Sequence, residues 1–257
     1  MKLGFKKKLL SSLEVIGEIA LLSKETFKAI FTRPFYFHRL VEQFCILGIN
    51  SIPITIVIGL VAGLVMALEF GFGLAKFGGT LYVPGVVSLS ITREIAPVFT
   101  SLLLAGRIGS GITAEIGAMN VSQQIDAIRA LGTSPIRVLV VPRLLATLIA
   151  LPLLTILADT MGLIGSFFIS KYEFNMTLGF YINKVLNHLN YNDFFSGLLK
   201  TFFFAFIITT VACYKGLNTK QGTKGVGDSA TWVVVNSSIA ILVCDFFLTK
   251  LFVVIMN

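Results

Sequence analysis

The sequence predicts an all-α integral membrane protein, with one N-terminal interfacial helix followed by five transmembrane helices. Hydrophobic residues make up 55% of the 257 residues and charged residues only 13%, whereas a soluble domain carries roughly 25% charged residues. Apolar runs of about twenty residues recur along the chain, a length that suits a hydrocarbon core about 30 Å thick. The formal net charge of +8 is expected of cytoplasmic loops rich in Lys and Arg, and we expect no nucleic-acid partner.

Residues 1–43 are predicted to form an amphipathic helix that lies in the membrane surface. Lysine and glutamate interrupt this region too often for a span, yet one helical face is apolar: Leu9, Leu13, Ile16, Ala20, Phe27 and Ile30. Such a helix buries its apolar face in lipid and turns its lysines toward anionic headgroups. Packing of the helix on the protein itself is the alternative. Pro34 is expected to end this helix or to bend the chain, and the basic start without a cleavage site predicts neither a signal nor a transit peptide.

Residues 44–257 are predicted to form a five-span domain. The apolar segments lie at about 44–68, 83–106, 138–170, 194–214 and 233–256. At 1.5 Å per residue the third segment would be roughly 50 Å long, which exceeds the hydrocarbon core of about 30 Å. It must therefore tilt, bend or protrude, and Pro142 and Pro152 offer places to bend.

The distribution of basic residues predicts the orientation of these segments. If the N-terminus is inside, the inner regions 1–43, 107–137 with its flank, and 215–232 hold fifteen basic residues. The outer regions then hold four, which are Lys76, Lys171, Lys184 and Lys200. Because basic residues accumulate on the cytoplasmic side, we expect the N-terminus inside and the C-terminus outside.

A short polar stretch between the second and third segments is predicted to be a helix of about 121–131 on the inner side. Asn120 is a suitable N-cap, and Gln123 stands where a capping-box partner belongs. Gly132 suits the C′ position, and Pro135 prevents continuation. The helix is too short to span a membrane and carries signals for both ends.

The two faces of this short helix differ in polarity. Val121, Ile125 and Ile128 share one face, and Ser122, Asp126 and Arg129 share another. The helix is either a connector that rests on the bilayer or a docking helix that enters a groove on another protein. The pattern leaves both interpretations open.

Two charged residues lie near the middle of the second apolar segment. Arg93 and Glu94 are adjacent there, and Pro97 follows. A charge at mid-bilayer costs on the order of 3 kcal/mol on insertion scales, so it usually faces a partner or a wet cavity. Asp159 and Asp245 are the candidate partners for Arg93. The pair marks either a substrate pathway, where an arginine can hold a phosphate, or a structural ion pair between helices.

The sequence contains none of the metal-binding, nucleotide-binding or hydrolase motifs considered below. The three cysteines show no CxxC spacing and the two histidines no HExxH, so neither a metal site nor a disulfide framework is expected. There is no GxxxxGK[ST] and no GxSxG, and no catalytic residue or cofactor is predicted. Any ATP hydrolysis linked to this chain would therefore be carried out by a separate protein.

The run SITREIAPVFTSLLLAGRIGSGITAEIGAMNVSQQIDAIRALGTSPIRVLVVPRLLA closely resembles the MlaE (YrbE) family of ABC transporter permeases. Segments 151–166, 215–238 and 242–249 resemble the same family in the same order. The resemblance covers essentially the whole chain, although the first forty residues match only in character. Its most specific block contains Glu115, Gly117, Gln124, Asp126 and Gly132.

The resemblance implies a homodimeric permease with one interfacial and five transmembrane helices. It implies two copies of a separate cytoplasmic or stromal ABC ATPase and an MCE-domain substrate-binding protein on the far side. The implied substrates are lipids, either phospholipids or plastid lipid precursors. The residues implied in coupling to the ATPase are Glu115, Gln124, Asp126 and Arg129, with Ala230 and Trp232 as additions. Those implied in the lipid pathway are Arg93 and Glu94. Pro97 is added to the predicted pathway because it removes a backbone donor and can kink the helix beside the pair.

The expected location follows from the composition and the resemblance together. The chain has 23 phenylalanines and many lysines, which fits an AT-rich genome. We expect the plastid (chloroplast) inner envelope membrane, with a bacterial inner membrane as the alternative. The chain is expected to be a transporter subunit and not an enzyme. A stand-alone secondary carrier and a structural membrane anchor of a lipid-binding complex are the alternative functions.

Overall fold

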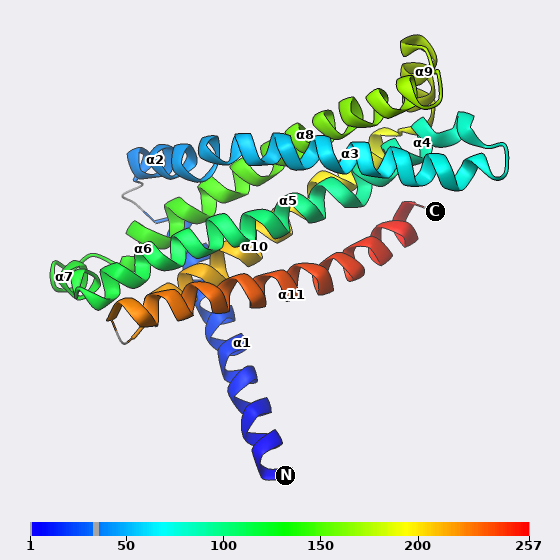
Figure 1. The fold of residues 1–257 in the computed structure, drawn as a ribbon. Coiled ribbons are helices and arrows are strands. Elements are labelled where there is room, and N and C mark those ends of the chain that lie inside the picture. Colours follow the sequence, from blue (N-terminus) through cyan, green and yellow to red (C-terminus); the bar gives the residue numbers. More distant parts are fainter. Residues whose placement is uncertain (1, 33–35, 221, 257) are drawn as a thin grey trace. The chain divides into compact units, whose positions relative to one another are not determined.

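The computed structural model describes residues 2–32, 36–220 and 222–256, and the side chains of 13–32, 36–220 and 222–255. Every regular element in this part of the chain is a helix (Figure 1). Five helical stretches are long and apolar enough to cross a membrane, namely Phe37–Ala75, Thr80–Val121, Ile136–Tyr172, Tyr191–Leu217 and Gly222–Ile255. The predicted fold class, an all-α membrane protein with five spans, is therefore confirmed.

The helices follow one another through short connections. The α-helices are α1 (Lys2–Ile30), α2 (Phe37–Leu47), α3 (Ile52–Ala75), α4 (Val83–Ser90), α5 (Ala96–Leu104), α6 (Ser110–Val121), α7 (Gln124–Ala130), α8 (Val141–Tyr172), α9 (Leu178–His188), α10 (Tyr191–Leu217) and α11 (Gly222–Met256). Three π-helical turns join some of them, η3 (Ile91–Ile95), η4 (Ala105–Gly109) and η5 (Ile136–Val140). Helix α8 runs unbroken through Pro152. A π-helical turn is common at functional sites, and η3 contains both Arg93 and Glu94.

The chain divides into two compact units. Unit 1 consists of Met1–Phe44, Ala105–Thr147 and Phe206–Ile239. Unit 2 consists of Cys45–Leu104, Leu148–Ala205 and Ala240–Asn257. Helices α2, α8, α10 and α11 contribute residues to both units, because boundaries fall within them.

In unit 2, small residues let the backbones of α3 and α8 approach closely. A Cβ atom on Gly63 would lie 1.9 Å from the carbonyl oxygen of Gly162, and one on Gly59 would lie 2.6 Å from that of Ala158. Spacing of small residues by four positions is the usual device for close helix packing in membranes, where lipid gives no hydrophobic drive for association. Apolar side chains, including Val83 of α4, complete the core beside α3.

Helix α9 of unit 2 is attached to α8 through a buried tyrosine. The hydroxyl of Tyr181 donates to the carbonyl oxygen of Leu163 at 2.9 Å and also forms a hydrogen bond with Ser166. Burial raises the pKa of Tyr181, so the phenol stays protonated and able to donate. The side-chain oxygen of Thr177 caps the start of α9 by accepting from the Phe180 amide.

In unit 1, the C-terminal half of α1 packs on α10 (Figure 1). The rings of Phe27 and Phe206 stack with centroids 5.6 Å apart, and Tyr214 donates to Glu18 at 2.5 Å. Thr26, one turn beyond the buried Leu22, is also fully buried. Part of the first helix is thus held by the protein itself.

Part of the apolar face predicted on α1 is exposed, although Phe27 of the same face stacks on Phe206. Leu13 is 57% exposed and Ile16 62% exposed. The helix ends at Ile30, while Pro34, the predicted breaker, lies outside the described residues. The side chain of Leu9 likewise lies outside them. An interfacial position of this helix in the membrane stays a prediction.

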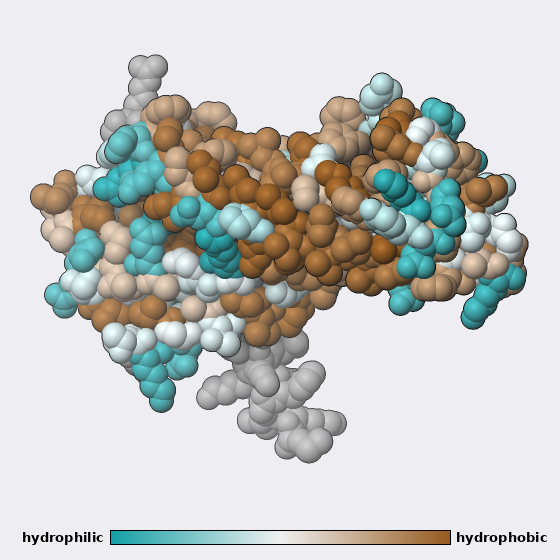
Figure 2. Space-filling view, turned by 45° about the horizontal axis from the view of Figure 1, so that its top comes forward, coloured by the Kyte–Doolittle hydropathy of each residue, from teal (hydrophilic) through white to brown (hydrophobic). Residues whose placement is uncertain are grey.

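Apolar side chains cover a large part of the visible surface in Figure 2. On α3 the exposed ones include Val57, Val61 and Val65, and on α11 they include Phe246 and Phe247. In water such surfaces would drive aggregation. They suit a chain whose surroundings are lipid or other membrane helices.

Candidate functional site

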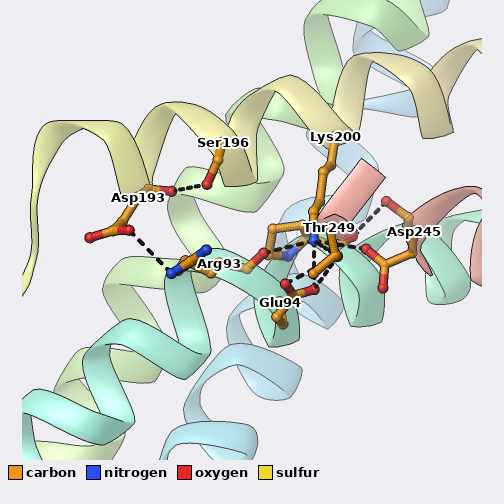
Figure 3. Close-up of polar contacts among 9 residues, drawn as sticks. Arg93, Glu94, Asp193, Ser196, Lys200, Asp245 and Thr249 are labelled. Carbon is orange, nitrogen blue, oxygen red and sulfur yellow. Dashed lines mark hydrogen bonds and ion pairs between the residues drawn. The ribbon is translucent and has the colours of Figure 1, made fainter. Parts of the chain in front are cut away.

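A buried lysine of unit 2 forms the centre of a charged cluster (Figure 3). The Lys200 side chain on α10 is 2% exposed. Its Nζ atom lies 2.6 Å from Glu94 Oε2, 2.9 Å from Asp245 Oδ1 and 2.6 Å from Thr249 Oγ1. The Thr249 hydroxyl in turn donates to Glu94 Oε1 at 3.2 Å. Residues from η3, α10 and α11 therefore share one network.

The local sequence explains how Lys200 reaches η3. A Cβ atom on Gly197 would lie 2.2 Å from the carbonyl oxygen of Thr92, so only glycine permits this approach of α10. Pro97 has no amide hydrogen, so the α-helical donor to the carbonyl oxygen of Arg93 is missing. Lys200 Nζ donates to that oxygen at 3.3 Å.

Arg93 pairs with Asp193 at the start of α10. Arg93 Nη1 lies 3.6 Å from Asp193 Oδ1, and the Asp193 side chain is 8% exposed. Asp193 Oδ2 also accepts from the Asn190 amide at 3.1 Å, in the manner of a capping box. The expectation that Asp159 or Asp245 would pair with Arg93 is wrong.

Asp159 and Asp245, the partners predicted for Arg93, have other surroundings. Asp245 is bound to Lys200. Asp159 on α8 is 4% exposed, and its Oδ1 has no hydrogen-bond partner among the described residues. Sequence pattern could not choose among the acidic residues because the choice depends on which helices meet and on their rotation.

The cluster contains three carboxylates and two cations, and its members differ in access. An ammonium group has three donors, and four acceptor atoms already surround that of Lys200. The Arg93 and Glu94 side chains are the more accessible ones, at 28% and 38% exposed. A molecule that approaches the cluster therefore meets Arg93 and Glu94 before Lys200. Pro97, the third residue of the predicted lipid pathway, is buried.

The distribution of basic residues predicts Lys200 on the outer side and gives no sign of its role in the cluster. Its neighbourhood, SGLLKTFFFAF, carries a single charge within an apolar run. That isolation is the same signal that drew attention to Arg93, because a lone charge in a span needs a partner.

Helix α7 of unit 1 is the short inner helix predicted between the second and third segments. It spans Gln124–Ala130, and Gln123 precedes it with φ of 59° and no side-chain cap. Asn120 is wrong as the N-cap, because it lies within α6 and its Nδ2 donates to the carbonyl oxygen of Thr219 at 2.9 Å. Val121 also belongs to α6, so its predicted face with Ile125 is wrong as well.

The end of α7 is the one that the sequence predicts. Gly132 adopts φ of 72°, its amide donates to the carbonyl oxygen of Arg129 at 2.9 Å, and the Thr133 amide donates to that of Ile128 at 3.2 Å. These two bonds form a Schellman motif with glycine at C′, as predicted.

Most of the α7 side chains are exposed. Ile125 is fully buried, whereas Asp126 and Arg129 form an exposed ion pair at 3.0 Å, and Gln124 is exposed beside them. Leu131, just after the helix, is 83% exposed. An exposed leucine next to paired charges is a surface suited to a partner.

Glu115 contacts a residue of its own chain. Its Oε1 lies 2.7 Å from Nη2 of Arg143, which is 4% exposed, while the Glu115 side chain is 52% exposed. Arg143 Nη1 also donates to the carbonyl oxygen of Leu139 at 2.8 Å. The pair connects α6 to the start of α8 within unit 1.

The second connection that the sequence predicts on the inner side leads into α11. Lys215 Nζ lies 4.9 Å from the ring centroid of Trp232, a cation–π contact. Ala230 lies half-buried nearby in the sequence. No group of three or more potential metal ligands occurs in the described part of the chain.

A comparison with models of protein families matches residues 40–251 to the family described as Permease MlaE. A probable ABC transporter permease protein of Rickettsia bellii is 36% identical over 92% of this chain and 92% of its own length. One of Synechocystis sp. is 41% identical over 82% of this chain and 80% of its own length.

A plastid relative is also similar. The Arabidopsis thaliana protein named TRIGALACTOSYLDIACYLGLYCEROL 1, chloroplastic, is 34% identical over 80% of this chain and 59% of its own length. The similarity thus extends to bacterial and chloroplast proteins. The range that matches the family model, residues 40–251, contains all the residues of the Lys200 cluster.

Proposed function

The chain belongs to the MlaE family of ABC transporter permeases, and from this premise we propose that it provides the membrane path for lipids. The observation that carries the proposal is the Lys200 cluster, which places two accessible charged side chains, Arg93 and Glu94, within predicted spans. A purely structural ion pair would gain nothing from such access, whereas a lipid headgroup needs polar contacts on its way through the membrane. The name of the Arabidopsis relative, which refers to a galactolipid, supports a lipid substrate.

The proposed pathway uses the construction of the cluster. Arg93 and Glu94 lie on a π-helical turn next to Pro97, and their partners lie on α10 and α11. A change in the separation of these helices would loosen the ion pairs and expose charge to a passing headgroup. Arg93 would contact the phosphate and Glu94 a donor group.

Energy would come from a separate ABC ATPase that docks on α7. The exposed Asp126–Arg129 pair, Gln124 and Leu131 form the docking surface in this proposal. Glu115 would act behind that surface, since its carboxylate is bound to Arg143 and links α6 to α8. ATPase closure would then move α7 and transmit force through these helices.

The transporter would contain two copies of this chain and an MCE-domain substrate-binding protein. We place it in the plastid inner envelope, with a bacterial inner membrane as the alternative, since the relatives include a chloroplast protein and bacterial proteins. Unit 1 would carry the ATPase side, because all fifteen basic residues of the predicted inner regions belong to it.

Reconstitution tests this proposal. The chain, co-purified with its ATPase and placed in proteoliposomes, should transfer fluorescent phospholipid or galactolipid precursor only with ATP. Arg93→Ala should lower the transfer at least about tenfold, the loss of one charge-assisted contact. Lys76→Ala, which removes an exposed charge of the same unit beyond α3, is the matched control and should transfer normally.

Two outcomes would contradict the proposal. Normal lipid transfer by a normally assembled Arg93→Ala complex would favour a structural anchor. Transfer by the purified chain without any ATPase would favour a secondary carrier.

A further inference from the structure

A polar pocket of about 340 Å³ lies in unit 1, apart from the residues discussed for lipid passage. Helices α2, α6 and α8 and the η5 turn line it, with Arg39, Glu42, Gln43, Glu115 and Arg143 as its charged and amide side chains. The Glu115–Arg143 ion pair forms part of its wall. The pocket is large enough for several water molecules or for a small polar headgroup.

Two buried polar atoms of this pocket's residues have no hydrogen-bond partner among the described residues. One is the acceptor Oε1 of Gln43, a residue that is 7% exposed. The other is the donor Nε of Arg143, a residue that is 3% exposed. Buried polar atoms are nearly always paired, because an unpaired one loses its hydrogen bonds to water and gains none in the protein. These two unpaired atoms predict an occupant that offers an acceptor to Arg143 Nε and a donor to Gln43 Oε1.

The pocket is formed by the ends of three predicted spans. Its residues come from the first turns of Phe37–Ala75, the last turns of Thr80–Val121 and the first turns of Ile136–Tyr172. Span ends lie at the depth of the lipid headgroups. A group that enters the pocket from the membrane is therefore a headgroup and not an acyl chain.

Charge favours an anionic part of that headgroup. Unit 1 carries fifteen basic and seven acidic residues. Arg39 and Glu42 are exposed on α2 and neither forms an ion pair with a described residue, whereas Glu115 is neutralised by Arg143. The carboxylate of Glu42 suits the donor group of the headgroup, and Arg39 suits its anionic part. A guanidinium fork matches phosphate oxygens, and the net field of the unit attracts anions.

We propose that this pocket binds the phosphodiester headgroup of a membrane phospholipid. The phosphate oxygens accept from Arg39 and from Nε of Arg143, and a hydroxyl or ammonium group of the headgroup donates to Oε1 of Gln43. The site lies in unit 1, whereas the proposed lipid pathway is built from residues of unit 2. It can therefore exist whether or not the chain transports lipids.

Native mass spectrometry of the purified chain in detergent, titrated with dioleoyl-phosphatidylglycerol, tests the proposal. Arg39→Gln should weaken lipid retention about tenfold, as expected for one charge-assisted hydrogen bond to phosphate. Gln43→Leu should weaken it several-fold and yet leave the lipid-free protein at least as stable, because it removes an unpaired buried acceptor. Lys28→Gln is the control, since it removes an exposed charge of α1 in the same unit.

Two further probes identify the source of the headgroup. Dioleoylglycerol has the same chains without a phosphodiester and should not be retained. Millimolar inorganic phosphate should not displace the phospholipid, because it lacks the chains that hold the headgroup in place.

Several results would overturn the proposal. Equal phospholipid retention by wild type, Arg39→Gln and Gln43→Leu would show that the pocket holds no headgroup. Equal retention of dioleoylglycerol would show that only chains are bound, and efficient displacement by inorganic phosphate would assign the pocket to a soluble anion. A loss of stability in Gln43→Leu would show that Oε1 already has a partner.

Discussion

The two units of this chain differ in net charge and in how deeply their central charged groups are buried. Unit 1 has fifteen basic and seven acidic residues, so it accounts for the whole net charge of +8, while unit 2 has six of each. Among the described charged side chains of unit 1 most are exposed, as in the Asp126–Arg129 pair, whose side chains are more than half exposed. In unit 2 the central charge, Lys200, is 2% exposed and bound by several acceptors.

This difference separates two uses of charge in a membrane protein. Exposed basic residues orient the chain and attract anionic surfaces, and each one contributes little to stability because water screens it. Buried charges need partners, and the loss of one partner leaves the other without hydration. Stability should therefore respond strongly to changes in the Lys200 cluster and weakly to changes on α7.

The largest effect is expected from Lys200→Met. It leaves Glu94 and Asp245 without their cation and should destabilise the fold by about 3 kcal/mol or more. Thermal unfolding in detergent, followed by circular dichroism, measures the change. The triple variant with Glu94→Gln and Asp245→Asn should recover much of the loss, and a single variant as stable as wild type would contradict the burial argument.

The next effect concerns backbone packing in unit 2. Gly63→Ala forces a methyl group against the carbonyl oxygen of Gly162 and should cost roughly 1–3 kcal/mol. Gly73→Ala in the same helix is the control, because nothing lies within 4 Å of the new Cβ, and it should be neutral or slightly stabilising. Equal melting temperatures of the two variants would show that α3 and α8 do not pack so closely.

Smaller losses of stability, unequal between the two partners, are expected from changes in the Glu115–Arg143 ion pair of unit 1. Glu115→Gln leaves the buried Arg143 without its counter-charge, whereas Arg143→Gln leaves a half-exposed Glu115 that can turn to water. Glu115→Gln should therefore lower the free energy of unfolding by about 1–2 kcal/mol and Arg143→Gln by less, because only Glu115→Gln leaves a buried charge without a counter-charge. Unfolding of both variants under the same conditions measures the two losses of stability. A larger loss in Arg143→Gln than in Glu115→Gln would contradict the burial of Arg143.

The smallest effect on stability is expected from Asp126→Lys. It replaces an exposed pair by a repulsion and should change the free energy of unfolding by no more than about 0.5 kcal/mol. ATPase stimulation by the permease should nevertheless fall sharply, because α7 is the proposed docking surface. Unchanged stimulation and unchanged co-purification of the ATPase would argue against this role.

Two features of the candidate site follow from the sequence alone. Arg93 and Glu94 stood out because charges in an apolar run are costly, and the end of α7 at Gly132 followed from the need for a positive φ. The start of α7 did not follow, since Asn120 donates to the distant Thr219 and not to the helix it was expected to cap. A cap signal can be satisfied by tertiary contacts, which a local pattern does not contain.

The sequence by itself determined the class of the protein, because twenty-residue apolar runs and the uneven basic residues leave only a membrane fold. Tertiary structure decided the partners of the buried charges. Lys200 reaches Glu94 and Asp245 because Gly197 allows α10 to contact the η3 backbone. The same placement of α10 brings Asp193 within reach of Arg93. Apolar periodicity fixes that a helix crosses the membrane, but its rotation and neighbours depend on close packing between residues far apart in the chain.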